Sequence, residues 1–352
     1  MSDAMTLFSQ ALEQLRLAAV NVPGLTDLAD APFLFRPLVM VVLLGVVAGV
    51  IGVIVNLRSA EFSAEAMVHA VFPGIVAGAV YWGIDAIIPA ASVVAVAAAL
   101  VLTIVSHRSR RGEASEAGTA VVLTSFFSIG LILSLAKGDM SGQLEALMFG
   151  RLLEVTDARL AQALIVCAVA LLLIMATWKE QVAYAFDRTG ARASGLRLLM
   201  LDLVLNTAIA ATVVSASTAV GILLVIGYLV IPGATARILA FRVRTMVLVA
   251  IAVGVGGGYL GMLLMALPET LDKPISPQAT VALVMTGILL LAVCVAAVRE
   301  RLRRPARRAR SAQSATAVST STTASADGTV DRAGGPEGAA SAVAPMAEGV
   351  RV

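Results

Sequence analysis

The sequence predicts an all-α polytopic membrane protein with about nine transmembrane helices, an external N-terminus and a cytoplasmic C-terminus. Three observations support this fold class. The 352 residues are 59% hydrophobic and 14% charged, and their mean hydropathy is +0.92. Soluble domains, in contrast, are about 45–50% apolar and about 25% charged. The other two observations are a series of long uncharged runs and the uneven distribution of basic residues between them.

The first 35 residues precede the long apolar runs and lack the basic start of a signal peptide. Phe8, Leu12 and Leu15 recur at helical spacing in this segment. The segment 1–35 is therefore predicted to be extracytoplasmic and to contain a short amphipathic helix.

Nine apolar runs follow between residues 36 and 298, the predicted transmembrane domain. A membrane span needs about 20 mostly apolar residues. The stretch 198–241, uncharged between residues 203 and 236, is long enough for two spans. We expect a turn at residues 215–218, because small hydroxylated residues favour turns. The predicted spans are 37–57, 66–84, 86–106, 117–136, 160–178, two within 198–241, 245–268 and 277–298.

The basic residues predict the orientation, because short cytoplasmic loops carry an excess of Lys and Arg. The segments after the third, fifth, seventh and ninth runs are basic, and nine spans place all four on one side. They hold Arg108, Arg110 and Arg111; Lys179, Arg188, Arg192 and Arg197; Arg237, Arg242 and Arg244; and seven arginines within 299–310. The segment 137–159 is predicted to be external although it contains three basic residues, since its net charge is −1.

The C-terminal end of the chain divides into two parts. Residues 299–310 form a basic juxtamembrane segment, for which contact with anionic membrane lipid is the simplest role. Residues 311–352 are rich in Ala, Ser, Thr and Gly and contain few bulky apolar residues. Such a segment cannot bury enough surface to fold, so we predict a disordered cytoplasmic tail.

Composition excludes several classes of function. The net charge of +3 is small and lies in residues 299–352, whereas residues 1–298 are near neutral, so nucleic acid is not an expected partner. None of the three lysines (Lys137, Lys179 and Lys273) follows a glycine, which excludes the phosphate-binding loop of ATPases. A zinc protease would need a His-Glu-x-x-His motif, and the only histidines are His69 and His107. The chain is therefore not expected to be an enzyme.

Glu65 and His69 form the most informative polar pair within the apolar runs. They are four residues apart and so share one face of a helix. Carboxylate and neutral imidazole are both ligands for zinc and manganese. Pro73 and Gly74 follow one turn later and are predicted to break or bend the helix near the pair. The alternative is a Glu at the water interface and a His satisfied by a neighbouring helix.

Asp202 and Asn206 repeat this spacing at the start of the sixth span. Ionisable groups at membrane depth are costly and so indicate function by default. The pair is a candidate for a secondary position on the transport pathway. An interfacial acid that complements Arg197 is the favoured alternative.

Three ordered segments resemble the zinc/manganese/iron uptake permeases of the ABC transporter superfamily. Residues 61–78 read EFSAEAMVHAVFPGIVAG, and the family has an acidic residue four before a histidine and then a Pro-Gly. Residues 185–195 read AFDRTGARASG and resemble the family's cytoplasmic segment. Residues 220–237 read VGILLVIGYLVIPGATAR and resemble its late Gly-rich span. The amino-acid sequence around residues 68–74 and 141–155 is most similar to the anchored-repeat branch of that family.

The resemblance implies a permease of the bacterial plasma membrane that imports a divalent metal ion, zinc or manganese. It implies a homodimer that works with a separate cytoplasmic ABC ATPase and an extracytoplasmic metal-binding lipoprotein. Glu65 and His69 fall on the family's membrane metal position. The transported zinc or manganese would be cargo, with no permanently bound cofactor. Metal ligands must be deprotonated, so uptake is expected to fall at low pH as His69 becomes protonated.

The segment that would contact the ATPase is Phe186, Asp187, Arg188, Ala191, Arg192 and Gly195. It falls in a loop already predicted to be cytoplasmic from its charge. Arg188 and Arg192 lie four apart and would give a short helix a polar face. A solvated positive loop would explain the charge equally well but not the match to the family motif.

The sequence departs from the family at two points. The family has Asp where Glu65 stands, which leaves an oxygen ligand but bears on the choice of metal. Ala117 and Gly118 replace the acidic residues that often precede Thr119 in the family. An ABC permease for a metal chelate or vitamin is one alternative. An ion-driven secondary transporter is another, although it should show inverted repeats, and Ile231-Pro232-Gly233 is only a partial second copy.

Overall fold

The computed structural model describes residues 2–83, 86–108, 112–136, 150, 152–217, 220–266 and 276–301. All regular elements within these residues are helices, which confirms the predicted all-α class. The chain divides into a unit Met1–Ala296, which holds nearly all the described helices, and a unit Ala297–Val352. The predictions for residues 302–310 and for the tail 311–352 lie outside the described residues.

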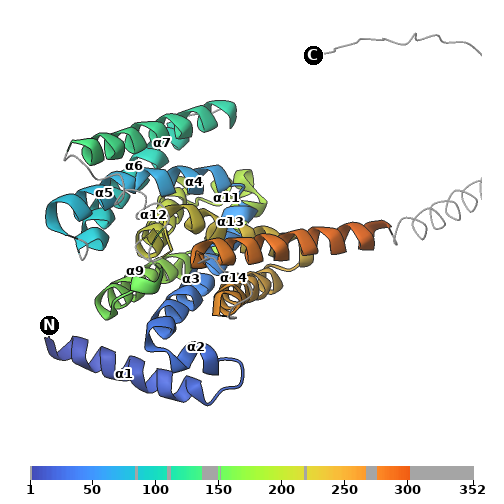
Figure 1. Ribbon diagram of the computed structural model, residues 1–352. Helices are drawn as coiled ribbons and strands as arrows, with labels where there is room; N and C mark the ends of the chain where they lie inside the picture. The colour runs from blue at the N-terminus through green and yellow to red at the C-terminus, as the bar shows by residue number, and fades with distance from the viewer. Residues whose placement is uncertain are drawn as a thin grey trace, which may run out of the picture. The chain divides into compact units, whose positions relative to one another are not determined.

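Eight helices in the described part of the chain are long and apolar enough to cross a membrane. A ninth apolar helix, α13 (Ile222–Leu239), is shorter, and its apolar part is Leu224–Leu239. Each of the nine predicted runs coincides with one of these helices (Figure 1). The number that crosses the membrane and the orientation of the termini stay predictions. The helices are α3 (Pro32–Leu57), Glu61–Trp82, α6 (Ile87–Arg108), α7 (Gly112–Leu135), α9 (Asp157–Ala176), α12 (Leu198–Ser217), α13 (Ile222–Leu239), α14 (Val243–Ala266) and Pro277–Arg301.

Two helices precede α3, namely α1 (Ser2–Val20) and α2 (Thr26–Asp30). Phe8 and Leu12 of α1 pack against the core as their spacing predicts, but Leu15 is 55% exposed. The next residue, Arg16, takes the inward position instead and donates to the carbonyl of Ala29 at 2.9 Å.

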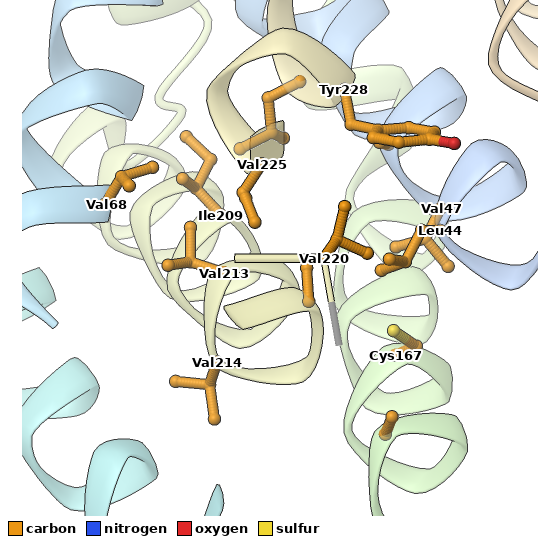
Figure 2. Packing of buried hydrophobic residues seen from close by; sticks show 14 of the residues in the cluster. Leu44, Val47, Val68, Cys167, Ile209, Val213, Val214, Val220, Val225 and Tyr228 are labelled. Atoms are coloured by element: carbon orange, nitrogen blue, oxygen red, sulfur yellow. The ribbon is translucent and has the colours of Figure 1, made fainter. Parts of the chain in front are cut away.

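The core forms around α3, which packs against α9, α12, α13 and α14. Small residues let these backbones approach closely. A Cβ added at Gly45 would lie 2.6 Å from the backbone nitrogen of Val255, and one at Gly52 would lie 2.4 Å from the carbonyl oxygen of Leu229. Figure 2 shows buried side chains of α3, α9, α12 and α13 meeting in this core.

The predicted turn at residues 215–218 is wrong at its start, because α12 remains helical through Ser217. The hydroxyls that favoured a turn are used within the helix. Ser215 donates to the carbonyl of Ala211 at 2.9 Å, and Ser217 donates to that of Val214 at 3.0 Å. Thr218, the last residue of the predicted turn, lies outside the described residues. Gly221 precedes α13 with a φ of 82° that favours glycine.

Short helices connect the long ones. η3 (Leu152–Glu154) precedes α9, and α10 (Trp178–Phe186) and α11 (Arg188–Ala193) lie between α9 and α12. The segment Glu61–Trp82 consists of α4 (Glu61–Ala70), α5 (Phe72–Ala77) and the π-helix η1 (Gly78–Trp82). These short elements carry most of the candidate functional residues, while Asp202 and Asn206 lie on α12.

Candidate functional site

Glu65 and His69 lie one turn apart on α4. Their neighbours Ala66 and Val68 are fully buried against other helices. Glu65 is exposed and His69 is half-buried, so this face of α4 is open while its other faces are packed.

The imidazole of His69 has one side in a packed aromatic contact and one nitrogen without a partner. Its ring meets that of Phe127 of α7 edge-on, with centroids 5.4 Å apart and planes at 84°. The Nδ1 atom is buried and makes no hydrogen bond. Buried polar atoms are ordinarily hydrogen-bonded, so a nitrogen left in this state has the capacity to take a ligand.

The pair supplies two ligands of the kind that zinc and manganese accept. Among the described residues there is no group of three or more His, Cys, Asp or Glu side chains placed to hold a metal. Structural zinc sites are closed by four protein ligands.

The helix that carries the pair is interrupted just beyond it. α4 ends at Ala70 and α5 begins at Phe72, with Pro73 in its first turn. Proline has no N–H to continue the ladder of the preceding turn. Gly74 allows α5 to lie against α6, since a Cβ there would come within 2.8 Å of the Cα of Ala91.

Asp202 and Asn206 have partners within the protein. Asp202 forms an ion pair with Arg58, and His107 Nδ1 lies 3.8 Å from the other carboxylate oxygen. The expected partner Arg197 is replaced by Arg58 from the end of α3. The Asn206 amide donates to the hydroxyl of Thr103 at 2.9 Å. Their place on a transport pathway stays a prediction.

The segment 186–195 is built around α11. The Asp187 carboxylate caps the helix by accepting from the backbone N–H groups of Thr189 and Gly190, both at 2.9 Å. Ala191 is buried, whereas Phe186 is 71% exposed. Ala191 therefore packs α11 on the protein, while the end of α10 at Phe186 is exposed.

Both arginines of this segment, Arg188 and Arg192, are exposed. Gly195 ends the segment with a φ of 81°, which glycine adopts without strain.

Sequence reasoning missed Arg58, Gln181 and Tyr184. Arg58 served only as the boundary of the first apolar run. One signal could have identified Arg58. It is a basic residue at the end of a span, and the helix with the candidate metal ligands begins only a few residues later. The partners of Arg58 could not be identified because they lie more than a hundred positions away in the sequence.

The model of the ABC 3 transport family matches residues 30–296. The chain is 33% identical to the manganese transport system membrane protein MntC of Listeria monocytogenes over 239 residues, which cover 68% of this chain and 83% of that protein. It is 31% identical to the chelated iron transport system membrane protein YfeC of Yersinia pestis over 212 residues, 60% of this chain and 70% of that protein.

Solved structures agree on the fold. PsaBC from Streptococcus pneumoniae in complex with Fab superposes with a TM-score of 0.65 at 24% identity, over 76% of this chain and 94% of that one. An inward-facing putative metal-chelate type ABC transporter gives 0.58 at 11% identity, over 83% and 99%. The chain belongs to the ABC 3 transport family: it is a multi-pass permease of the bacterial plasma membrane and not an enzyme.

Proposed function

We propose that this permease is the membrane subunit of an importer for a divalent metal ion, zinc or manganese. The observation that carries the proposal is on α4, where the exposed Glu65 and the half-buried His69, whose buried Nδ1 has no partner, lie one turn apart beside a helix interruption. Relatives named for manganese and for chelated iron support the same class of cargo. The metal ion is the substrate, so no permanently bound cofactor is needed.

The energy for transport comes from ATP hydrolysis on a separate ABC ATPase subunit in this proposal. The chain has no phosphate-binding loop, and α11 with the exposed Phe186 offers a surface on which such a subunit could act. An extracytoplasmic lipoprotein delivers the ion to the outer mouth. Two copies of the chain form the channel, and residues 299–310 contact anionic lipid.

In the proposed mechanism, Glu65 and His69 bind the ion briefly during its passage. Transport requires binding that is strong enough for entry and weak enough for release. Two protein ligands, with water completing the coordination, satisfy both requirements better than a closed four-ligand site.

The test is metal uptake in a bacterial strain that lacks its own zinc and manganese importers. The chain is expressed with its ATPase and lipoprotein as wild type, Glu65→Gln and His69→Ala, and supplied in turn with manganese, zinc and iron. Glu61→Gln is the matched control, because it makes the same change one turn earlier on α4. We expect both ligand variants to lose uptake while they still assemble and Glu61→Gln to retain it. Normal uptake by Glu65→Gln and His69→Ala would contradict the proposal.

A further inference from the structure

The C-terminal end of α3 carries a buried arginine that the transport mechanism above does not use. The Arg58 side chain is only 8% exposed and makes an ion pair with Asp202. It also donates to Gln181 Oε1 at 2.6 Å and lies over the ring of Tyr184, 4.0 Å from the centroid. One side chain therefore holds α3, α10 and α12 together.

The partners of Arg58 are themselves fixed. Gln181 is fully buried, and its amide donates to the carbonyl of Leu201 on α12 at 2.9 Å. Asp202 is approached from α6 by His107. Direct polar contacts thus join Arg58, Gln181 and Asp202, and such a network fixes the arrangement of the helices that carry it.

On one side, the Arg58 cluster is continuous with α11. Tyr184 packs with Ala191, Leu198 and Leu201 in a small hydrophobic cluster separate from the main core. The guanidinium of Arg188, at the start of α11, lies 5.8 Å from the same tyrosine ring. A movement of α11 would therefore displace the Tyr184 side chain first. The guanidinium of Arg58 lies over the ring of this tyrosine.

On the other side, the cluster is continuous with α4. Only Ser59 and Ala60 separate Arg58 from the first residue of α4. This turn is tight: Ser59 has a φ of 51°, and the Ala60 N–H donates to the carbonyl of Val55 at 2.9 Å. Because only two residues connect Arg58 to α4, a displacement of Arg58 would also move α4, the helix that carries the candidate metal ligands.

We propose that Arg58 is a positioning residue that couples movement of α10 and α11, the surface offered to the ATPase, to movement of α4. The proposal rests on the proposed function for its direction, from ATPase to metal helix. It goes beyond that function by naming the residue through which the two sites communicate. Spatial continuity alone does not establish that Arg58 couples α11 to α4, so the response of α4 must be measured with Arg58 altered.

The test follows the reactivity of a thiol on α4 in the full chain assembled with its ABC ATPase in lipid nanodiscs. Phe62→Cys, at a side chain 38% exposed near the start of α4, is the reporter, and the exposed Cys294 is replaced by serine. The rate of labelling by a thiol reagent is measured with and without ATP and vanadate. Arg58→Met and Arg58→Lys are then introduced into this background.

The matched control is Arg36→Met, which breaks the other ion pair of α3, with Asp157. We expect ATP to change the labelling rate in the background chain and in Arg36→Met. In Arg58→Met the ATP-dependent change in labelling rate is lost. In Arg58→Lys it is smaller, because an ammonium group lacks the planar set of N–H donors with which the guanidinium binds Gln181 and Asp202 together. Coupling residues of this kind alter responses by about two- to thirty-fold.

A retained ATP response in Arg58→Met, or no ATP response in the background chain, would overturn the inference. If Arg58→Met does not assemble, Arg58→Lys decides, and an undiminished response there overturns the inference. Metal uptake is measured for the same variants in cells of the importer-deficient strain, because nanodiscs enclose no compartment. A background chain that responds to ATP but moves no metal would contradict the proposed function and leave the Arg58 inference standing.

Discussion

Two polar sites lie seven residues apart in the sequence and differ in almost every physical respect. The Arg58 cluster is largely buried, and an ion pair, hydrogen bonds and a ring contact join its members. The Glu65–His69 pair has an exposed carboxylate and a buried nitrogen without a partner. The comparison indicates that the first site holds helices in place and that the second is left open for an exchangeable ligand.

The largest expected difference between the two sites is in stability. Asp202→Ala leaves Arg58 buried without its counter-charge, which costs about 3–5 kcal/mol for a buried pair. Glu65→Gln changes an exposed side chain and is expected to alter stability by less than about 0.5 kcal/mol. Thermal unfolding of both variants in detergent measures the difference. Equal losses of stability would remove the distinction between the sites.

Packing along α3 should matter next. Gly52→Ala places a methyl group against the carbonyl of Leu229 and forces α3 away from α13, at a cost of about 1–3 kcal/mol. Gly256→Ala on α14 is the matched control, because no atom lies within 4 Å of the added carbon. The same unfolding measurement applies. A neutral Gly52→Ala would show that the Arg58 end of α3 is held by its polar contacts alone.

A smaller effect is expected at Asn206. Its amide donates to Thr103, whose hydroxyl also donates to the carbonyl of Ala99 at 2.7 Å. Asn206→Ala should therefore cost about 1 kcal/mol of stability and leave metal uptake unchanged. Reduced uptake at unaltered stability would instead place Asn206 on the transport pathway.

The smallest effect is a pH dependence of the Arg58 cluster. Burial raises the pKa of Tyr184 above its ordinary value of 10, and the Asp202 carboxylate raises it further. The folded state therefore holds this proton more tightly than the unfolded state. The resulting contribution to stability is fully present below pH 10 and is lost as the pH rises through the raised pKa. Tyr184→Phe should remove this part of the alkaline destabilisation, as read from unfolding at a series of pH values.

Much of the fold could be predicted because membrane spans are local features of the sequence. Charge-free runs and the positions of Arg58, Arg108 and Arg197 were enough to locate the helices, with ends a few residues in error. The turn near Ser215 was misplaced because its hydroxyls bond within the helix, which composition does not reveal.

The candidate site was only partly predictable for the same reason. The spacing of Glu65 and His69 is local, and so is the Pro73 that follows them. The environment of Asp202 is not local, since its partners come from α3 and α6. The aromatic contact of His69 is also not local, because Phe127 comes from α7.

The most direct test of the contrast between an open metal site and a closed positioning cluster is the kinetics of metal uptake. The metal concentration for half-maximal uptake and the maximal rate are measured side by side for Glu65→Gln and Arg58→Lys. We predict that Glu65→Gln raises the half-maximal concentration by more than about tenfold, so that its uptake is lost at the metal concentrations that suffice for the wild type and returns only well above them. Arg58→Lys should lower the maximal rate and leave that concentration unchanged. The same change in both parameters for both variants would contradict the account.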